Sequence, residues 1–334
     1  MVESQANSNT MRSNVDGYGF ERGEDFDYKT YEEFMAKYIS ILARRASKWE
    51  VLVQNKTSIV KSRKVKRFCR KGIPNGHRAM VWMCVSGADE KMKRNPDTYK
   101  KLLLSQKDQS LMDTIDLDLH RTFPENIYFS TSDGLRKPLR NVLGAVAHKN
   151  HDQGYCQGLN FIVGLLLLLI KDEEKVFWLM DTLINDLLPD YYHPDMKAVK
   201  ADQELLGEII RWKDPEVYAH IEKHSVSWCL IGIKWFICLF ADVLPVETVY
   251  RIWDCLFYEG AKILYRVSAM LVIQNRDKLL ACKSFTEITD VFKEIVNNPT
   301  IVDCHTFLQK CFNELGSFPI ARLKKIQEEC RERP

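Results

Sequence analysis

Arg121 stands where a predicted helix meets a loop, a position where catalytic groups tend to lie. At about 100° per residue this helix has one apolar face, formed by Leu111, Met112, Ile115 and Leu119. Arg121 falls at the rim of that face, and residues 122–124 end the helix just beyond it. A purely structural role is also open, because Asp118 at i,i+3 and the helix dipole both favour an arginine in the last turn.

A second candidate is Gln157, in the stretch Gly154-Tyr155-Cys156-Gln157-Gly158-Leu159-Asn160. A glycine on each side lets the backbone adopt a positive φ or approach a partner closely. The stretch leads into the apolar run from Phe161 to Ile170, so it holds a neutral amide near the N-terminus of a predicted buried helix. The plainer alternative is a tight turn between helices, in which Gln157 satisfies stray backbone groups.

The elements that must position these two stretches are predicted to be helices. From Tyr31 onward apolar residues recur at spacings of three and four, first as Tyr31, Phe34, Met35, Tyr38, Ile41 and Leu42. No train of alternating strand patterns occurs, and most Pro and Gly residues fall between helical blocks. No block repeats with a period of about 20 to 50 residues, which argues against a solenoid. The pattern predicts an all-α, multi-helix fold.

Two further segments carry polar groups into apolar surroundings. Gly72-Ile73-Pro74 ends one element, and Pro74 starts a helix with Arg78 and Trp82 on one face. Further on, one predicted helical stripe consists of Trp228, Ile231, Trp235 and Leu239. Residues 244–245 break this stripe before a second helix that holds Arg251, Trp253 and Asp254. This helical hairpin is predicted to be mostly core.

Composition narrows the class of protein. The 334 residues are 46% hydrophobic and 28% charged, as in a globular protein, and the net charge of +3 is too small to indicate a nucleic-acid partner. The longest apolar run, Phe161 to Ile170, has half of the ~20 residues that a membrane span needs. Residues 1–16 lack the apolar core of a secretory signal, and the ten scattered cysteines indicate reduced thiols. We therefore expect a cytoplasmic protein.

Motifs for self-contained chemistry are absent. The sequence has no Gly-x-x-x-x-Gly-Lys-Ser/Thr phosphate loop, no serine nucleophile elbow and no His-Glu-x-x-His zinc pair. Two weak metal-site alternatives are Cys304 and His305 with Cys311, and His148 with His151; an apolar helix surface explains the first better, and the second lacks a third ligand. No bound metal or cofactor is expected.

These stretches resemble, in order, the three signatures of TBC domains, the GTPase-activating domains for Rab GTPases. The matching strings are Gly72-Ile73-Pro74 with Arg78 and Trp82, Ile115-x-x-Asp118-x-x-Arg121, and Tyr155-x-Gln157. The C-terminal half is similar through Trp235-Phe236, Leu239-Phe240, Leu244-Pro245, Arg251-x-Trp253-Asp254 and Gly260. Each motif is short, but their order is hard to produce by chance. The resemblance covers roughly residues 17 to 315.

The resemblance implies a role for each motif residue. Arg121 and Gln157 would be catalytic, the first as an arginine finger that stabilises charge on the transferred phosphate, the second as a glutamine finger that aligns the attacking water. The implied supporting residues are Asp118, Arg78, Trp82, Tyr155 and Ile115. Asp118 would orient Arg121 or Arg78. Tyr155 would pack or hydrogen-bond at the interface, and Trp82 would brace its helix from the core.

The implied partner is a Rab-family small GTPase in its GTP-bound form, which carries GTP and Mg²⁺. The chain itself would then need no cofactor, have no GTPase activity of its own, and meet membranes only indirectly and peripherally, in vesicle trafficking. The alternative is a TBC-fold adaptor that binds a Rab without accelerating hydrolysis, so enzymatic activity stays open at this point. The expected organisation is a disordered tail over 1–26, a helical extension over 27–66, the TBC domain over 67–320 with its motifs within about 70–262, and a tail over 321–334.

Overall fold

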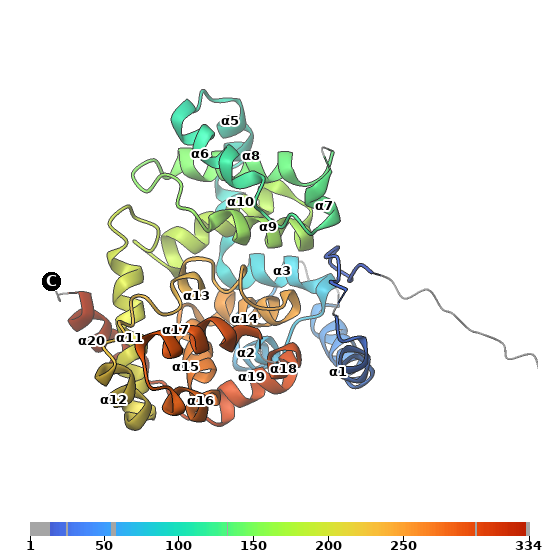
Figure 1. Ribbon diagram of the computed structural model, residues 1–334. Helices are drawn as coiled ribbons and strands as arrows, with labels where there is room; N and C mark the ends of the chain where they lie inside the picture. Colours follow the sequence, from blue (N-terminus) through green and yellow to red (C-terminus); the bar gives the residue numbers. More distant parts are fainter. Residues whose placement is uncertain (1–13, 25, 55–57, 132, 298, 332–334) are drawn as a thin grey trace, which may run out of the picture.

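The computed structural model describes residues 14–24, 26–54, 58–131, 133–297 and 299–331. Within these residues the chain is helical, and its extended pairing is limited to two isolated bridges, Val15 with Glu21 and Phe20 with Asn126. The predicted all-α fold is confirmed (Figure 1).

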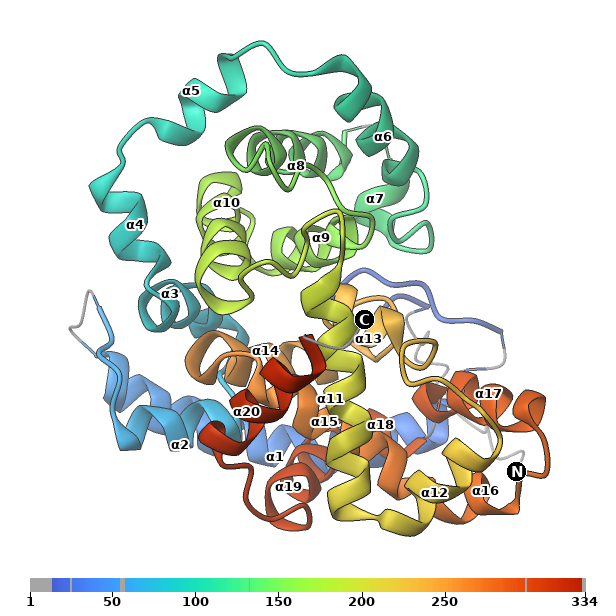
Figure 2. The ribbon, with the colours of Figure 1, turned by 90° about the vertical axis from the view of Figure 1, so that its left-hand side faces the viewer.

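The first part of the chain forms an arc of helices around three inner ones. Figure 2 shows α3 to α6 following one another around α8, α9 and α10. The helices of this part are α1 (Tyr28–Val53), α2 (Arg63–Lys71), α3 (Asn75–Ser86), α4 (Ala88–Arg94), α5 (Thr98–Leu104), α6 (Gln109–Leu119), α7 (Ile127–Ser130), α8 (Arg136–Lys149), α9 (Leu159–Ile170) and α10 (Glu173–Thr182), which continues into a π-helical turn at Leu183–Leu187.

The rest of the chain packs below this arc in the view of Figure 2, together with α1 and α2. Its helices are α11 (Lys197–Lys213), α12 (Pro215–Lys223), α13 (Ile233–Ile237), α14 (Val246–Glu259), α15 (Lys262–Gln274), α16 (Arg276–Ala281), α17 (Phe285–Glu294), a 3₁₀ turn (Ile295–Asn297), α18 (Pro299–Val302), α19 (Cys304–Asn313) and α20 (Ile320–Arg331). Helix α14 packs against α2, α3, α15 and α19, and so joins the two parts.

Local sequence accounts for where these helices begin and end. Asp27, Ser62 and Asp108 cap α1, α2 and α6 by accepting a hydrogen bond from a backbone N–H in the first turn. Gly72 ends α2 with φ at 107°, a conformation that favours glycine, and Pro74 then precedes α3. The predicted buried helix is α9, which is buried along almost its whole length.

The structure describes contacts within both of the segments expected to be tails. Residues 14–24 were expected to belong to a disordered tail, yet Tyr18 stacks edge-on against Tyr250 and its hydroxyl bonds to Glu247. At the other end, residues 321–331 continue α20, whose Leu323 and Cys330 are buried. Polar composition hid these few anchoring side chains. Residues 1–13, 25 and 332–334 lie outside the described residues.

The predicted stripe from Trp228 to Leu239 is correct in burial but wrong in helical continuity. All four of its residues are buried, but only Ile233–Ile237 within it is helical. Leu239 and Phe240 have φ of 48° and 67°, which an α-helix does not allow. Trp253 donates to the carbonyl of Leu239 at 3.0 Å and so helps to hold this turn. The ten cysteines all lie in described residues and form no disulfide.

Candidate functional site

Arg121 lies in the turn that follows α6. Its side chain is 49% exposed, and its Nη2 lies 2.5 Å from Oδ1 of Asp118, whose side chain is buried. Among the described residues this is the only ion pair that Arg121 makes. Ile115 and Met112, on the apolar face of α6, are buried and fix the helix against the core. The guanidinium is therefore held at one edge and open to solvent elsewhere.

The loop between α8 and α9 carries Gln157 at the surface. Gly154 and Gly158, which bound it, have φ of 65° and 112°. A Cβ on Gly158 would lie 2.6 Å from Cγ2 of Ile237 in α13, so the loop approaches α13 too closely for a larger residue. Both sequence arguments for glycine, positive φ and close approach, hold at Gly158.

A hydrogen-bonded network joins the two loops. The Tyr155 hydroxyl donates to Oδ2 of Asp118 at 2.5 Å, and the Thr122 hydroxyl donates to the Asp118 carbonyl at 2.7 Å. Asn160 donates to Thr122 Oγ1 at 2.9 Å and accepts from the Gly158 backbone N–H at 3.0 Å. Asp118 and Asn160 are almost fully buried. The loop of Arg121 and the loop of Gln157 thus share one set of buried polar groups.

The electrostatics of this network favour a neutral tyrosine. Burial, reinforced by the hydrogen bond to Asp118, raises the pKa of the Tyr155 phenol far above its usual value. Tyr155 therefore stays protonated and remains a donor to Asp118, which in turn faces Arg121 from its other oxygen. The structure thus places the Tyr155 hydroxyl in a hydrogen bond inside the fold, and its predicted role at an interface stays a prediction.

An aromatic cluster supports the turn after Arg121. Phe123 meets the rings of Phe20, Phe129 and Phe161 with centroids 5.3, 5.8 and 5.4 Å away. A Cβ on Gly164 of α9 would lie 2.9 Å from the Phe123 ring, so α9 approaches this turn closely. The packing fixes the backbone that carries Arg121.

The first predicted motif lies in a different cluster. Arg78 is fully buried, with Nε 3.2 Å from Oδ1 of Asp254 and Nη2 3.0 Å from Oε1 of Glu247. Burial opposes its charge, but Asp254 and Glu247 outweigh burial and hold the pKa of Arg78 above its usual range. Trp82 donates to Asp254 at 3.0 Å, which agrees with its predicted bracing role. Asp118 thus pairs with Arg121, and Arg78 takes other partners.

Neither metal-site alternative forms a site in the structure. Among the described residues, no group of three or more His, Cys, Asp or Glu side chains could hold a metal ion. Cys304 and Cys311 are buried in α19, and His305 Nδ1 lies 2.6 Å from Nη2 of Arg45. His151 pairs with Asp152 instead of His148.

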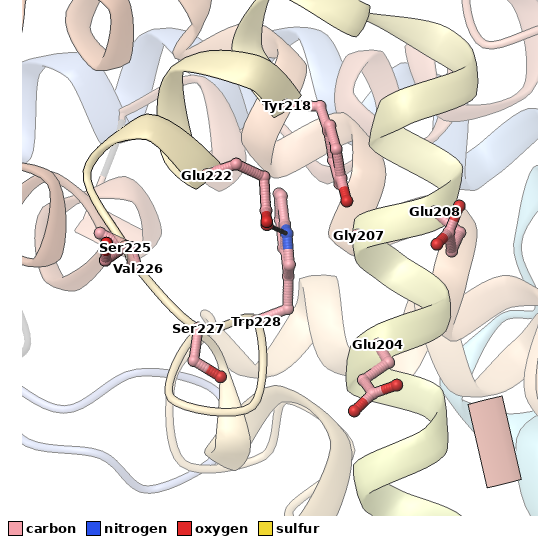
Figure 3. A pocket seen from close by; sticks show the side chains of 9 residues that line it. All are labelled: Glu204, Gly207, Glu208, Tyr218, Glu222, Ser225, Val226, Ser227 and Trp228. Atoms are coloured by element: carbon pink, nitrogen blue, oxygen red, sulfur yellow. Dashed lines mark hydrogen bonds between the residues drawn. The ribbon is translucent and has the colours of Figure 1, made fainter. Parts of the chain in front are cut away.

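A cavity of about 390 Å³ lies elsewhere, between α11 and the segment after α12. Figure 3 shows Trp228 beside Tyr218, with the Trp228 ring nitrogen donating to Glu222 at 3.2 Å. None of the predicted site residues lines it.

Sequence reasoning missed three members of these clusters. Thr122 was considered only as part of a helix stop, Asn160 only as the end of the glycine-bounded stretch, and Glu247 not at all. A polar residue flanked by apolar ones, as Asn160 is by Leu159 and Phe161, was the available signal for a buried hydrogen-bonding role.

This fold and these motifs define a class of protein: residues 75–280 match the Rab-GTPase-TBC domain family, and the chain belongs to that family. Its most similar relatives include growth hormone-regulated TBC protein 1-A of Danio rerio, 47% identical over 99% of this chain and 94% of the relative. Growth hormone-regulated TBC protein 1 of Homo sapiens is 49% identical over 96% of this chain and 95% of the relative. The sequences of residues 18–26 and 235–259 suggest a likeness to growth hormone-regulated TBC protein. These identities confirm that likeness.

A solved structure agrees with the fold. The Chlamydomonas flagellar RabGAP TBC domain superposes with a TM-score of 0.78 at 28% identity, over 90% of this chain and 99% of that domain. No helix among the described residues combines the length and apolar character that crossing a bilayer requires.

Proposed function

We propose that this chain accelerates GTP hydrolysis on a Rab-family GTPase by placing Arg121 and Gln157 against the bound nucleotide. The main support is the network of Asp118, Tyr155, Asn160 and Thr122, which joins the loops that carry two exposed side chains 157 − 121 = 36 residues apart. A chain in which these motifs only stabilised helices would have no need to hold both at one surface. GTP and Mg²⁺ would come with the GTPase.

Arg121 has the chemistry that this role needs. Negative charge spreads over the phosphoryl oxygens in the transition state, and a permanently charged planar guanidinium can contact two of them at once. Asp118 holds one edge of Arg121, which reduces the side-chain freedom lost when the finger engages. Tyr155 and Thr122 fix Asp118 in turn, so they act as positioning residues.

Gln157 has the chemistry to orient water. Its amide oxygen can accept a hydrogen bond from the attacking water while its amide N–H groups donate to a phosphate oxygen. Because the loop rests on α13 through Gly158, the amide projects from a supported backbone.

Apolar side chains beside both loops support docking of a protein partner. Leu117, one turn before Arg121, is 75% exposed, and Ile233, one turn before Ile237 on α13, is 47% exposed. Exposed apolar groups with polar or charged residues around them are typical of protein interaction sites. The chain would act in the cytoplasm, at the membranes that carry its GTPase, and so in vesicle trafficking.

The test is single-turnover phosphate release from a panel of purified, GTP-loaded Rab GTPases. We expect acceleration on the order of 10³ to 10⁵ for the cognate GTPase. The chain alone should neither bind nor hydrolyse GTP. Tight binding of a GTPase without acceleration would overturn the proposal and favour the adaptor.

A further inference from the structure

Helix α2 carries an unusually dense positive charge. Seven of the eleven residues from 61 to 71 are Lys or Arg and none is acidic, in a chain whose net charge is only +3. Nothing in the finger network uses this helix. Its charge therefore calls for a separate explanation.

The helix sorts its residues into two sides. Val65 and Cys69 are buried, and Phe68 packs edge-on against Trp49 with ring centroids 5.6 Å apart. At about 100° per residue, the six basic residues of the helix occupy a continuous arc of about 160° opposite this apolar side. They are Arg63, Lys64, Lys66, Arg67, Arg70 and Lys71.

Two of these cations are paired within the fold. Arg70 and Lys66 both pair with Glu259, at 2.5 and 3.0 Å, and the Glu259 side chain is only 8% exposed. The other four, which we call the α2 basic face, are exposed and make no ion pair within the described residues: Arg63, Lys64, Arg67 and Lys71. Since Glu259 is already paired with Arg70 and Lys66, the four cations of the basic face are available to an anionic partner.

The geometry selects the kind of partner. An acidic protein that wraps an amphipathic helix needs its apolar side, which here is buried in the core. Nucleic-acid binding commonly draws on a more basic domain than a chain of pI 8.2. An anionic membrane surface requires only a row of exposed cations, and clusters of four to eight are typical of such contacts.

One exposed apolar side chain strengthens this choice. Val60, just before the helix, is 80% exposed, and Lys61 beside it lies over the Tyr258 ring at 5.3 Å. An apolar side chain flanked by cations can enter the headgroup region while the cations remain at the phosphates.

We propose that the α2 basic face binds anionic lipid headgroups and seats this protein directly on a negatively charged membrane. This contact goes beyond the indirect one through a GTPase and does not depend on the finger residues. Figure 2 shows α2 at the lower left and α6, which precedes the Arg121 turn, at the upper right, so the two helices lie in separate parts of the molecule.

The test is vesicle flotation with the full chain. The vesicles are phosphatidylcholine alone, phosphatidylcholine with phosphatidylserine, and phosphatidylcholine with a phosphoinositide at matched surface charge. The variant combines Arg63→Gln, Lys64→Gln, Arg67→Gln and Lys71→Gln. The matched control removes four exposed lysines from other helices: Lys101→Gln, Lys137→Gln, Lys223→Gln and Lys278→Gln. Both take the net charge from +3 to 3 − 4 = −1.

We expect binding to both anionic vesicles, weakening with salt, and none to neutral ones. Each cation near the surface contributes about fivefold, so the variant should bind at least tenfold and up to ~10³-fold more weakly, while the control keeps most of its binding. Circular dichroism and activation of a soluble GTPase should be unchanged in both.

Several results would overturn the proposal. One is equal loss in variant and control, which would indicate net charge alone. Another is binding that requires the phosphoinositide at matched charge, which would indicate a headgroup-specific pocket. Capture by calmodulin or duplex DNA without vesicle binding would point to a different class of partner.

Discussion

Arg78 and Arg121 both pair with an aspartate, yet their surroundings differ. The Arg78 side chain is 1% exposed and lies between Asp254 and Glu247, so its guanidinium N–H groups bond to partners inside the fold. The Arg121 side chain is 49% exposed and has Asp118 at one edge. The first arginine holds helices together, and the second keeps part of its guanidinium exposed to solvent. Membership in a motif does not separate these roles, whereas burial and the number of partners do.

The sharpest test of this contrast is Arg121→Ala, with Arg121→Lys beside it. Both should lower kcat toward the cognate GTPase by about 10³-fold or more, since lysine keeps the charge but loses the planar fork. Thermal stability should hardly change, because a half-exposed ion pair contributes ~0–1 kcal/mol. A control is Arg140→Ala, which removes a 42% exposed arginine 2.6 Å from Asp116. Wild-type kcat in Arg121→Lys would contradict the finger assignment.

Arg78→Ala should show the opposite pattern. Removing this cation leaves Asp254 and Glu247 without their main partner, at a cost of about 3–5 kcal/mol in the free energy of unfolding. Urea denaturation measures this loss directly. If Arg78→Ala kept normal stability but lost activity, the buried cluster would be functional and the comparison would fail.

Gln157→Ala should reduce kcat by about 10²-fold, in line with the loss of one group that acts in the transition state. A GTPase whose own switch glutamine is replaced should still respond to the wild-type chain, because in the proposed mechanism Gln157 supplies the amide in trans. Phosphate release in the four combinations of wild-type and substituted partners distinguishes the cases. The glutamine finger would be excluded if the substituted GTPase were not accelerated by the wild-type chain and Gln157→Ala released phosphate at the wild-type rate. A single arginine finger would then remain.

Tyr155→Phe asks whether the network positions Arg121. Losing a hydrogen bond to a charged group should lower kcat by about tenfold with little change in KM. Tyr265→Phe is the control, because that hydroxyl donates to buried Asp202 at 2.8 Å, away from the finger loops. It should cost stability alone. Equal kcat values for the two variants would remove Tyr155 from the positioning network.

The smallest effect concerns His305, whose Nδ1 lies 2.6 Å from Nη2 of Arg45. Burial and the nearby Arg45 lower the pKa of His305 to about 4. Between about pH 6.5 and 4 the unfolded chain therefore binds the extra proton, so stability is full above this window and falls as pH drops through it. With solvent screening, about 1 kcal/mol should be lost. Melting curves of His305→Gln should lack this component; an unchanged pH profile would assign it to another group.

The fold class, the place of Arg121 at a helix end and the place of Gln157 in a glycine-bounded loop could be predicted from the sequence. These features depend on residues close together in the chain, through helical periodicity and the backbone freedom of glycine. The network between them involves residues far apart in the chain, so the choice of Asp118 between Arg121 and Arg78 stayed open until the fold settled it. Tyr18 was missed for a related reason: its partners, Tyr250 and Glu247, lie more than two hundred positions away. Single anchoring side chains leave no periodic signal.

The anchoring of both ends bears on how this family is divided into modules. The family match spans residues 75–280, yet Tyr38 donates to Glu247 at 2.9 Å and Arg70 pairs with Glu259 at 2.5 Å from outside it. At the other end, Gln327 of α20 donates to Asp202 at 2.5 Å. A transplant of residues 75–280 into a relative would remove the native partners of Glu247, Glu259 and Asp202. A segment that keeps these contacts when it is exchanged between relatives runs from Tyr18 through α20.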